Sequence, residues 1–352
     1  MKHMKKTALA AVLATGFATA AVAETVLIYT EGGPNRGTRA AALQGFADNV
    51  KEISDGDLAI DIHWGGALMK LTATLGGVRD GAADMGTVLS AYEPKRLMAF
   101  GIGDLPLASS DPWVGMRAMY ELMTTNQEMI DSFAAENVVY ISNYTSTGVN
   151  LNCTGDHRIE TIEDIKGKKI RVGGTYAKVL NDLGANTITM GYNEVYQALD
   201  SGLVDCEAGY LYTLEGYKLY EVLNHTALAN WGQLTGFGIA MNKDVYDGLS
   251  QEQQQVLAKA GDQLVDDFAR AQIEQMSVIV DGLRSGDIGR KVEVVEFQDR
   301  DKLLEASAKY RNEWAGEVSK LGIDGDGLWS AYTALIAKYE NELETKGYPW
   351  NR

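Results

Sequence analysis

The sequence predicts an α/β protein of two lobes, each built on a mostly parallel sheet. Short β-prone runs alternate with helical patterns along the whole chain, an order typical of parallel sheets covered on both faces. Roughly 330 residues remain after an N-terminal targeting segment, which is more than one hydrophobic core usually holds. Two stretches in the middle of the chain are suited to crossing between lobes.

The targeting segment covers residues 1–23. Three lysines near the start precede an apolar run at 8–20, and Ala21-Val22-Ala23 follows, which is the pattern of a secretory signal peptide. The apolar run is too short to span a bilayer permanently. We therefore expect an exported, periplasmic protein whose mature chain is not inserted in the membrane.

The first part of the mature chain alternates in period between strand and helix. The predicted helix at 38–53 has its apolar face at Leu43, Phe46 and Val50, the spacing of a half-buried helix. The predicted elements, in order, are strand 25–30, helix 38–53, strand 58–64, helix 68–78, strand 83–89, loop 99–106, helices 113–123 and 128–135, and strand 138–143.

Two crossings define the predicted lobes. Residues 145–153, rich in Thr, Ser, Asn and Gly, lead into the second lobe, and a strand at 234–241 returns to the first. Two crossings form a hinge pair, about which lobes can close on a ligand. We expect lobe I at 24–148 plus 235–285, and lobe II with the C-terminal helices at 149–234 plus 286–352.

A long helix is predicted at 250–283. Ser250 with Gln253 or Gln254 predicts a capped start, and no proline interrupts the pattern. A pair of helices broken at Gly261 is the alternative. A strand at 292–297 and helices at 302–321 and 328–343 complete the chain.

The strongest functional signal lies between residues 162 and 217. A β-prone run at 168–172 ends in a Gly pair, which places Arg171 near the carboxyl end of a strand, where ligands collect in open α/β sheets. A guanidinium suits a bidentate grip on a carboxylate. A surface ion pair is the alternative role for Arg171. A helix is predicted at 193–203, with Asn193 as its N-cap and Leu203 on its apolar face.

Several motifs resemble those of one transport family. They are Lys-Gly-x-Lys-Ile-Arg-Val at 166–172, Glu-Val-Tyr-Gln-Ala-Leu at 194–199, Gly-x-Val-Asp at 202–205, Leu-Tyr-Glu-Val at 219–222, and the segment 77–86. Together they resemble the DctP-type periplasmic solute-binding proteins of tripartite ATP-independent periplasmic (TRAP) transporters, a family typified by dicarboxylate binders. The resemblance covers essentially the whole mature chain.

The resemblance implies a two-lobe periplasmic binding protein fold, type II-like, with hinge-crossing strands and a long helix bracing both lobes. It implies capture of a small organic acid anion, a carboxylate or a sulfonate, and delivery to TRAP membrane permease subunits. We expect a monomer with no cofactor. A binding component of an ATP-driven (ABC-type) importer, and a periplasmic enzyme with Glu207 or Asp205 as its base, are the alternatives.

The resemblance also assigns ligand-binding roles to individual residues. Arg171 corresponds to the carboxylate-clamping arginine of the family, and Tyr192 falls at a pocket aromatic. Lys70 lies where some relatives carry a polar contact from the first lobe, and Glu31 is a further first-lobe candidate.

The sequence departs from the family pattern at two places. Gly209, followed by Tyr210, stands where the family often has a supporting Asn. Leu151, flanked by Asn150 and Asn152, stands where some members have a second basic residue. Gly209, Tyr210, Asn150 and Asn152 stay ligand-binding candidates. The departures favour a monoanion with an aromatic or polyhydroxylated body over a sialic acid or a simple C4-dicarboxylate.

Aromatic residues gather at predicted strand ends. Tyr210, Tyr212 and Tyr217 follow one strand, Trp231 ends the second lobe, and Trp64 ends a first-lobe strand. Any single aromatic is more often core packing. Several at strand ends predict a pocket that covers the apolar body of a ligand.

Charge and histidine spacing exclude other classes of function. The net charge is −16, from 48 acidic and 32 basic residues, so no basic stripe is available for nucleic acid. The four histidines lack metal-ligand spacing, so no metal site is expected.

Two cysteines, Cys153 and Cys206, are present in a chain predicted to reach an oxidising compartment. We predict a disulfide if their strands are neighbours. A catalytic thiol is the weaker alternative, because no histidine lies beside either cysteine in the sequence.

Overall fold

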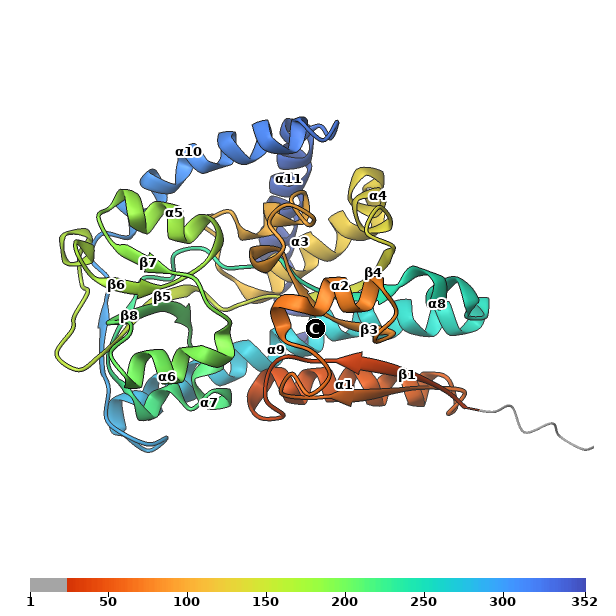
Figure 1. The fold of residues 1–352 in the computed structure, drawn as a ribbon, viewed down its shortest axis with the longest axis horizontal. Helices are drawn as coiled ribbons and strands as arrows, with labels where there is room; N and C mark the ends of the chain where they lie inside the picture. Colours follow the sequence, from red (N-terminus) through yellow and green to blue (C-terminus); the bar gives the residue numbers. More distant parts are fainter. Residues whose placement is uncertain (1–23) are drawn as a thin grey trace, which may run out of the picture.

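The computed structural model describes residues 24–352, and the predicted signal peptide lies outside them. Within this part of the chain the strands form two sheets, each at the centre of one lobe. Figure 1 shows the two lobes side by side, with much of the first sheet among the red to yellow elements and most of the second among the green ones. The predicted two-lobe α/β fold is therefore confirmed.

The first sheet has the strand order β2-β1-β3-β10-β4. β1, β2 and β3 pair in parallel, whereas β10 runs antiparallel to both β3 and β4. Its strands are β1 (Thr25–Thr30), β2 (Leu58–His63), β3 (Met85–Leu89), β4 (Val138–Tyr144) and β10 (Phe237–Asn242).

The second sheet has the order β11-β9-β5-β8-β6-β7. Only β5 runs against its neighbours within the described residues. Its strands are β5 (Val149–Thr154), β6 (Lys169–Arg171), β7 (Asn186–Ile188), β8 (Cys206–Tyr210), β9 (Leu223–Leu228) and β11 (Glu293–Glu296). Each sheet is thus mostly parallel with one reversed strand, and each reversed strand directly follows a crossing between the lobes.

Helices cover both sheets. The first lobe carries α1 (Gly37–Ile53), α2 (Thr74–Arg79), α3 (Pro112–Thr125), α4 (Gln127–Ala134), α8 (Lys243–Gly248) and most of α9 (Gln251–Ser285). The second carries α5 (Gly174–Asp182), α6 (Val195–Asp200) and α7 (Thr213–Gly216). Of the two C-terminal helices, α10 (Arg300–Ser319) packs on α5, and α11 (Gly325–Lys346) packs on α3 (Figure 1). Within residues 24–352 no helix is both long and apolar enough to cross a membrane.

The hinge consists of two crossing segments bonded to each other. The amide of Ser146 donates to the carbonyl of Leu234 at 2.8 Å, and the amide of Leu234 donates to the Ser146 hydroxyl at 2.8 Å. The amide of Val149 donates to the carbonyl of Gly232 at 3.1 Å. The two predicted crossings therefore run side by side as one ribbon.

α9 is a single uninterrupted helix of 35 residues, as predicted, with a capping box at Ser250 and Gln253. Gly261 does not break it. A Cβ at Gly261 would lie 2.5 Å from the carbonyl oxygen of Ile141, so the glycine lets α9 pack closely on β4. The helix contacts α1, α3 and β4 of the first lobe and β11 of the second.

Two predicted helices differ from the structure by more than a shift of their ends. The 193–203 helix is a 3-10 turn, η5 (Tyr192–Glu194), followed by the short α6, and Asn193 is not its cap. Gly202, at φ +70°, ends it, and Leu203 is 54% exposed. The 68–78 helix begins only at Leu71, because the backbone of Lys70 is extended.

Candidate functional site

A cavity lies where the carboxyl ends of the parallel strands of both sheets meet. This is the expected place for ligands in open α/β sheets. It encloses about 720 Å³ of non-atom space, part of it open to solvent. The lining residues are Glu31, Arg39, Leu71, Leu89, Ala91, Tyr92, Tyr144, Val149, Arg171, Val172, Gly173, Tyr176, Tyr192, Ala208, Tyr210, Tyr212, Thr213, Tyr217, Leu234 and Phe237.

Arg171, at the end of β6, is the cationic group that the second lobe contributes to the cavity. Its Nη2 donates to the Tyr92 hydroxyl at 3.2 Å and to the Met190 carbonyl at 2.9 Å, and its guanidinium lies 4.7 Å from the centre of the Tyr192 ring. Its Nε is buried and has no partner. Arg171 is thus held in position while part of its hydrogen-bonding capacity stays unused.

The surroundings of Arg171 keep it charged. Burial acts to lower its pKa, but the oxygens of Tyr92, Tyr210, Tyr192 and Glu207 outweigh burial, and the net pKa is raised. Burial also raises the pKa of Tyr192 and of Tyr210 well above the usual tyrosine value, so both stay neutral hydrogen-bonding groups. The second-lobe side of the site therefore offers one charged donor among neutral phenols.

The first lobe contributes a second buried arginine, Arg39, but this one is already paired. The Arg39 guanidinium forms an ion pair with Glu31 and donates to the Pro34 carbonyl at 2.9 Å. Glu31 also accepts from the amide of Gly33 at 2.7 Å and from the Thr87 hydroxyl at 2.6 Å. A Cβ at Gly33 would lie 2.0 Å from the Arg39 guanidinium, so only glycine lets the loop pass this close.

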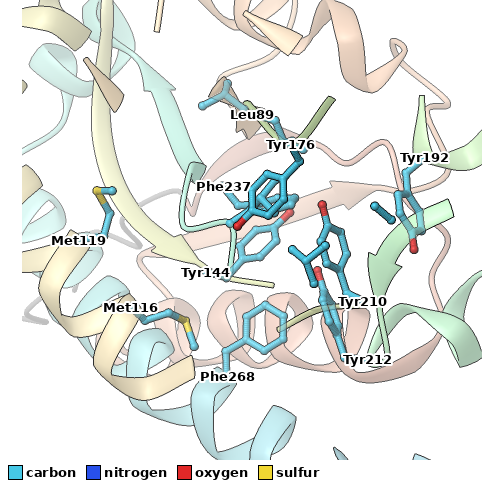
Figure 2. Close-up of a cluster of buried hydrophobic side chains, with 14 of the residues drawn as sticks. Leu89, Met116, Met119, Tyr144, Tyr176, Tyr192, Tyr210, Tyr212, Phe237 and Phe268 are labelled. Carbon is cyan, nitrogen blue, oxygen red and sulfur yellow. The ribbon is translucent and has the colours of Figure 1, made fainter. Parts of the chain in front are cut away.

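Aromatic rings form most of the remaining wall. Figure 2 shows Tyr144, Tyr176, Tyr210 and Tyr212 gathered in one cluster, with Tyr192 to one side. The rings of Tyr192 and Tyr210 stack at 5.8 Å, and those of Tyr210 and Tyr212 at 6.1 Å. Within the described chain the hydroxyls of Tyr210, Tyr212 and Tyr217 form no hydrogen bond with another residue. Flat apolar faces and free hydroxyls suit a ring-bearing ligand.

Four of the sequence-predicted ligand residues line this cavity: Arg171, Tyr192, Tyr210 and Glu31. Tyr212 and Tyr217, which follow the same predicted strand, also line it. Their contact with a ligand stays a prediction.

The other six candidates lie outside the lining. Trp231 is fully buried behind Tyr176, and the two ring centres lie 4.7 Å apart. In the hinge, the Asn150 side chain donates to the carbonyl of Gly148 at 3.0 Å and accepts from the amide of Asn230 at 3.0 Å. Lys70 is exposed and Trp64 half-buried, both away from the cavity wall.

Asn152 and Gly209 lie beside Glu207. The Asn152 amide donates to Glu207 at 3.1 Å, and a Cβ at Gly209 would lie 2.5 Å from the Glu207 carboxylate. The missing side chain at Gly209 therefore makes room for Glu207.

Sequence reasoning missed two important residues, Arg39 and Tyr92. Arg39 lies in the first turn of α1, where the sequence does not distinguish a buried arginine from a solvent-facing one. The Gly-Gly-Pro loop before it is the one sequence feature that points to a special role. Tyr92, in the 3-10 turn η2 (Ser90–Tyr92), accepts hydrogen bonds from Arg171 Nη2 and, at 3.1 Å, from the amide of Tyr192. It thereby connects the first lobe to the arginine of the second.

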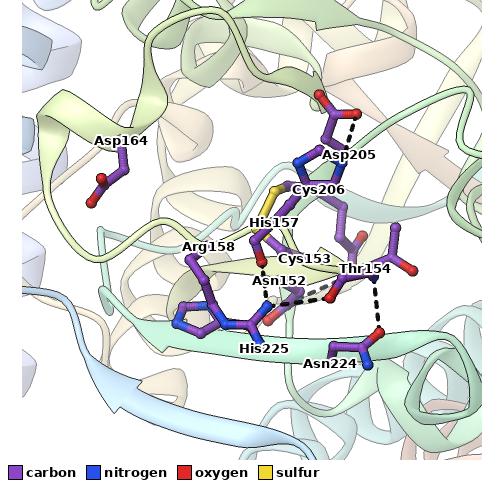
Figure 3. The surroundings of a disulfide bond; sticks show 12 residues. Asn152, Cys153, Thr154, His157, Arg158, Asp164, Asp205, Cys206, Asn224 and His225 are labelled. Carbon is purple, nitrogen blue, oxygen red and sulfur yellow. Dashed lines mark hydrogen bonds and ion pairs between the residues drawn. A yellow bond between two sulfur atoms is a disulfide. The ribbon is translucent and has the colours of Figure 1, made fainter.

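Two buried groups stabilise the frame of the site. Cys153 on β5 and Cys206 on β8 are joined by a disulfide (Figure 3), beside the strand that carries Glu207 and Tyr210. Asp104 accepts hydrogen bonds from the Ser90 hydroxyl and, at 2.9 Å, from the amide of Gly236, and it fastens the return crossing to the first lobe. Residues 24–352 contain no group of His, Cys, Asp and Glu that could hold a metal ion.

Comparison with known proteins agrees with this architecture. A solute-binding protein of Sulfitobacter sp. strain NAS-14.1 is 26% identical over 319 residues, covering 88% of this chain and 92% of that protein. A TRAP solute-binding protein from Rhodoferax ferrireducens T118, in complex with copurified benzoate, superposes with a TM-score of 0.80 at 21% identity, over 90% of this chain and 99% of that one.

A TRAP periplasmic solute-binding protein from Bordetella bronchiseptica with bound (R)- and (S)-mandelate has a TM-score of 0.79 at 22% identity, over 90% of this chain and 99% of that one. These structural likenesses establish the fold. The family model described as bacterial extracellular solute-binding protein, family 7 (DctP), matches residues 31–316. The chain therefore belongs to family 7 of the bacterial extracellular solute-binding proteins.

Proposed function

We propose that this protein captures a singly charged organic acid with a ring-bearing body in the periplasm and delivers it to the membrane permease of a TRAP-type secondary transporter. One observation carries the proposal. Arg171 is a buried guanidinium on the cavity wall, forms no ion pair with a carboxylate of the described chain, and keeps an unpartnered Nε. A buried charge of this kind is expected to find its counter-ion in the ligand.

The charges around the cavity favour one carboxylate over two. Arg39 is neutralised by Glu31, which leaves Arg171 as the positive group available to a ligand. A second carboxylate would be buried against phenols without a cation, at a cost of several kcal/mol. The stacked tyrosines match an aromatic body, and the two related structures described above hold benzoate and mandelate.

The lobes proposed to close on this ligand are residues 24–148 plus 235–285 and residues 149–234 plus 286–352. Tyr92 and Arg36 support closure. Arg36 precedes α1, and its Nη2 donates to the carbonyl of Gly216 in the second lobe at 2.6 Å. The family resemblance supports the TRAP permease as the partner and binding without turnover.

A thermal-shift screen tests the proposed ligand class. Benzoate, mandelate, phenylacetate, succinate and phthalate would each be added to the purified protein. A ligand at 100 times its Kd adds about 2.7 kcal/mol of stability, which is readily seen. We expect the monocarboxylates with rings to give the largest shifts. Shifts for succinate alone, or none with any acid, would contradict the proposal, and a recovered ligand that is chemically altered would indicate an enzyme.

A further inference from the structure

A row of four buried polar side chains crosses the second sheet at the level of Arg171. Thr226, Asn152, Glu207 and Arg171 lie on the adjacent strands β9, β5, β8 and β6 and are register partners in that order. Residues opposite each other on neighbouring strands project to the same face. The first three are fully buried and Arg171 is 5% exposed.

Each member of the row has one polar atom without a hydrogen-bond partner. These atoms are Thr226 Oγ1, Asn152 Oδ1, Glu207 Oε2 and Arg171 Nε. Buried polar atoms in native proteins nearly always have a partner. Of these four atoms only Glu207 Oε2 can take up a proton, and it can do so without breaking an existing hydrogen bond.

Glu207 is the acidic member of this row, and no cation of the described chain lies within ion-pair distance of it. Its Oε1 accepts from the Asn152 amide at 3.1 Å and from the Tyr192 hydroxyl at 3.3 Å. The charged or titratable groups that face it are Arg171 from β6 and Tyr192 from η5. α6 packs over β5 and β8, and its buried side chains are apolar: Val195, Ala198 and Leu199. His225 is the register partner of Cys153 and belongs to the opposite face.

Burial raises the pKa of Glu207, and the positive charge of Arg171, together with the hydrogen bonds from Asn152 and Tyr192, opposes this rise. A ligand carboxylate on Arg171 would cancel most of that positive field. Glu207 would then face a net negative neighbourhood, which favours its protonated form further. Ligand binding and protonation of Glu207 should therefore assist each other.

We propose that Glu207 is a specificity-determining residue that acts through Arg171: it takes up a proton from solvent when Arg171 binds an acid, and it disfavours ligands with a second negative charge. The inference rests on the proposed function. It adds that a residue outside the cavity lining selects singly charged over doubly charged ligands. The proton comes from the buffer and converts the Glu207 carboxylate to a carboxylic acid.

Calorimetric titration of the wild type with benzoate, in two buffers of different ionisation enthalpy from about pH 5 to about pH 8, measures proton uptake directly. We expect a fraction of one proton per benzoate, so Kd should rise with pH by less than about tenfold per pH unit, and the part of Glu207 that stays ionised repels a second negative charge. Glu207→Gln should remove this slope. It should also raise the affinity for phthalate relative to benzoate several-fold.

Glu194→Gln is the matched control, because Glu194 is an exposed carboxylate close to Tyr192 and outside the cavity wall. This variant should keep the wild-type dependence of the benzoate Kd on pH and the wild-type affinity for phthalate relative to benzoate. Infrared difference spectra with ¹³C-labelled glutamate provide a readout that needs no variant, since a protonated glutamate band should appear when benzoate is added.

The role of Glu207 would be overturned if benzoate bound without proton uptake. It would also be overturned if Glu207→Gln kept the wild-type pH dependence of Kd or the wild-type affinity for phthalate relative to benzoate. The proposed function would stand in each case. If no acid in the screen binds at all, the proposed function fails and this inference fails with it.

Discussion

The two arginines of the cavity wall differ in what surrounds them. Arg39 in the first lobe is paired with Glu31, whose carboxylate also accepts hydrogen bonds from Gly33 and Thr87. Arg171 in the second lobe touches phenols and a carbonyl but no carboxylate. Residue type and burial are the same, so the partner alone separates a structural arginine from one that can bind a ligand.

The largest expected effect comes from breaking the paired arginine. Arg39→Met leaves Glu31 buried without its cation, and we expect a loss of about 3–5 kcal/mol in the free energy of unfolding. Urea unfolding followed by circular dichroism measures it. The double variant Arg39→Met with Glu31→Gln should recover most of the loss. A single variant as stable as the wild type would show that the pair is not structural.

Arg171→Met is the matched change in the second lobe. It should weaken binding of the native acid by about 2–5 kcal/mol, roughly 30-fold to several thousand-fold in Kd. The loss of unfolding free energy should be smaller than for Arg39→Met, because no paired carboxylate is left behind. Arg171→Lys should also bind weakly, since the planar fork is lost. Calorimetry showing an unchanged Kd for Arg171→Met would remove Arg171 from the site.

Asp104 shows what a buried carboxylate does without any cation. Burial raises its pKa to about 6, although hydrogen bonds from Ser90 and Gly236 oppose the shift. A raised pKa means that its contribution to stability is fully present below about pH 4 and is lost as pH rises through about 6. Relative to the wild type, Asp104→Asn should therefore gain about 2–3 kcal/mol of unfolding free energy between about pH 4 and about pH 7. Denaturant unfolding at several pH values checks this, with Asp156→Asn as a control for the loss of one exposed charge.

Tyr92→Phe should have the smallest effect. It removes the oxygen that accepts from Arg171 at 3.2 Å and from the amide of Tyr192 at 3.1 Å, and it leaves the ring in place. We expect about 1 kcal/mol less binding free energy, or about fivefold in Kd, because these contacts join the lobes. If the variant lost stability but kept its affinity, Tyr92 would not couple closure to Arg171.

The fold could be predicted largely because its signals are local. The 3.6-residue period, the capping box at Ser250 and the alternation of elements are properties of short windows. Strand direction is not local, so the reversal of β5 and β10 was not predicted. Residues around 192–203 look continuously helical by period, whereas tertiary contacts of Tyr192 and the left-handed Gly202 shorten the helix.

The site was less predictable for a related reason. Asn150 and Asn152 necessarily share one face of β5, but the sequence does not say whether that face borders the cavity. The structure places both beside Gly209 and Glu207, outside the lining. Arg39 could not be distinguished from a surface arginine, because its partner Glu31 lies eight residues away across a loop.

The two hinge segments, bonded to each other from Ser146 to Gly232, restrict how the protein can open. Shearing one segment along the other would break these bonds, whereas flexing both together preserves them. We therefore expect the two lobes to open by hinge bending about a single axis. The contacts of Arg36 and Tyr92 would then separate at the start of release, before the acid leaves Arg171.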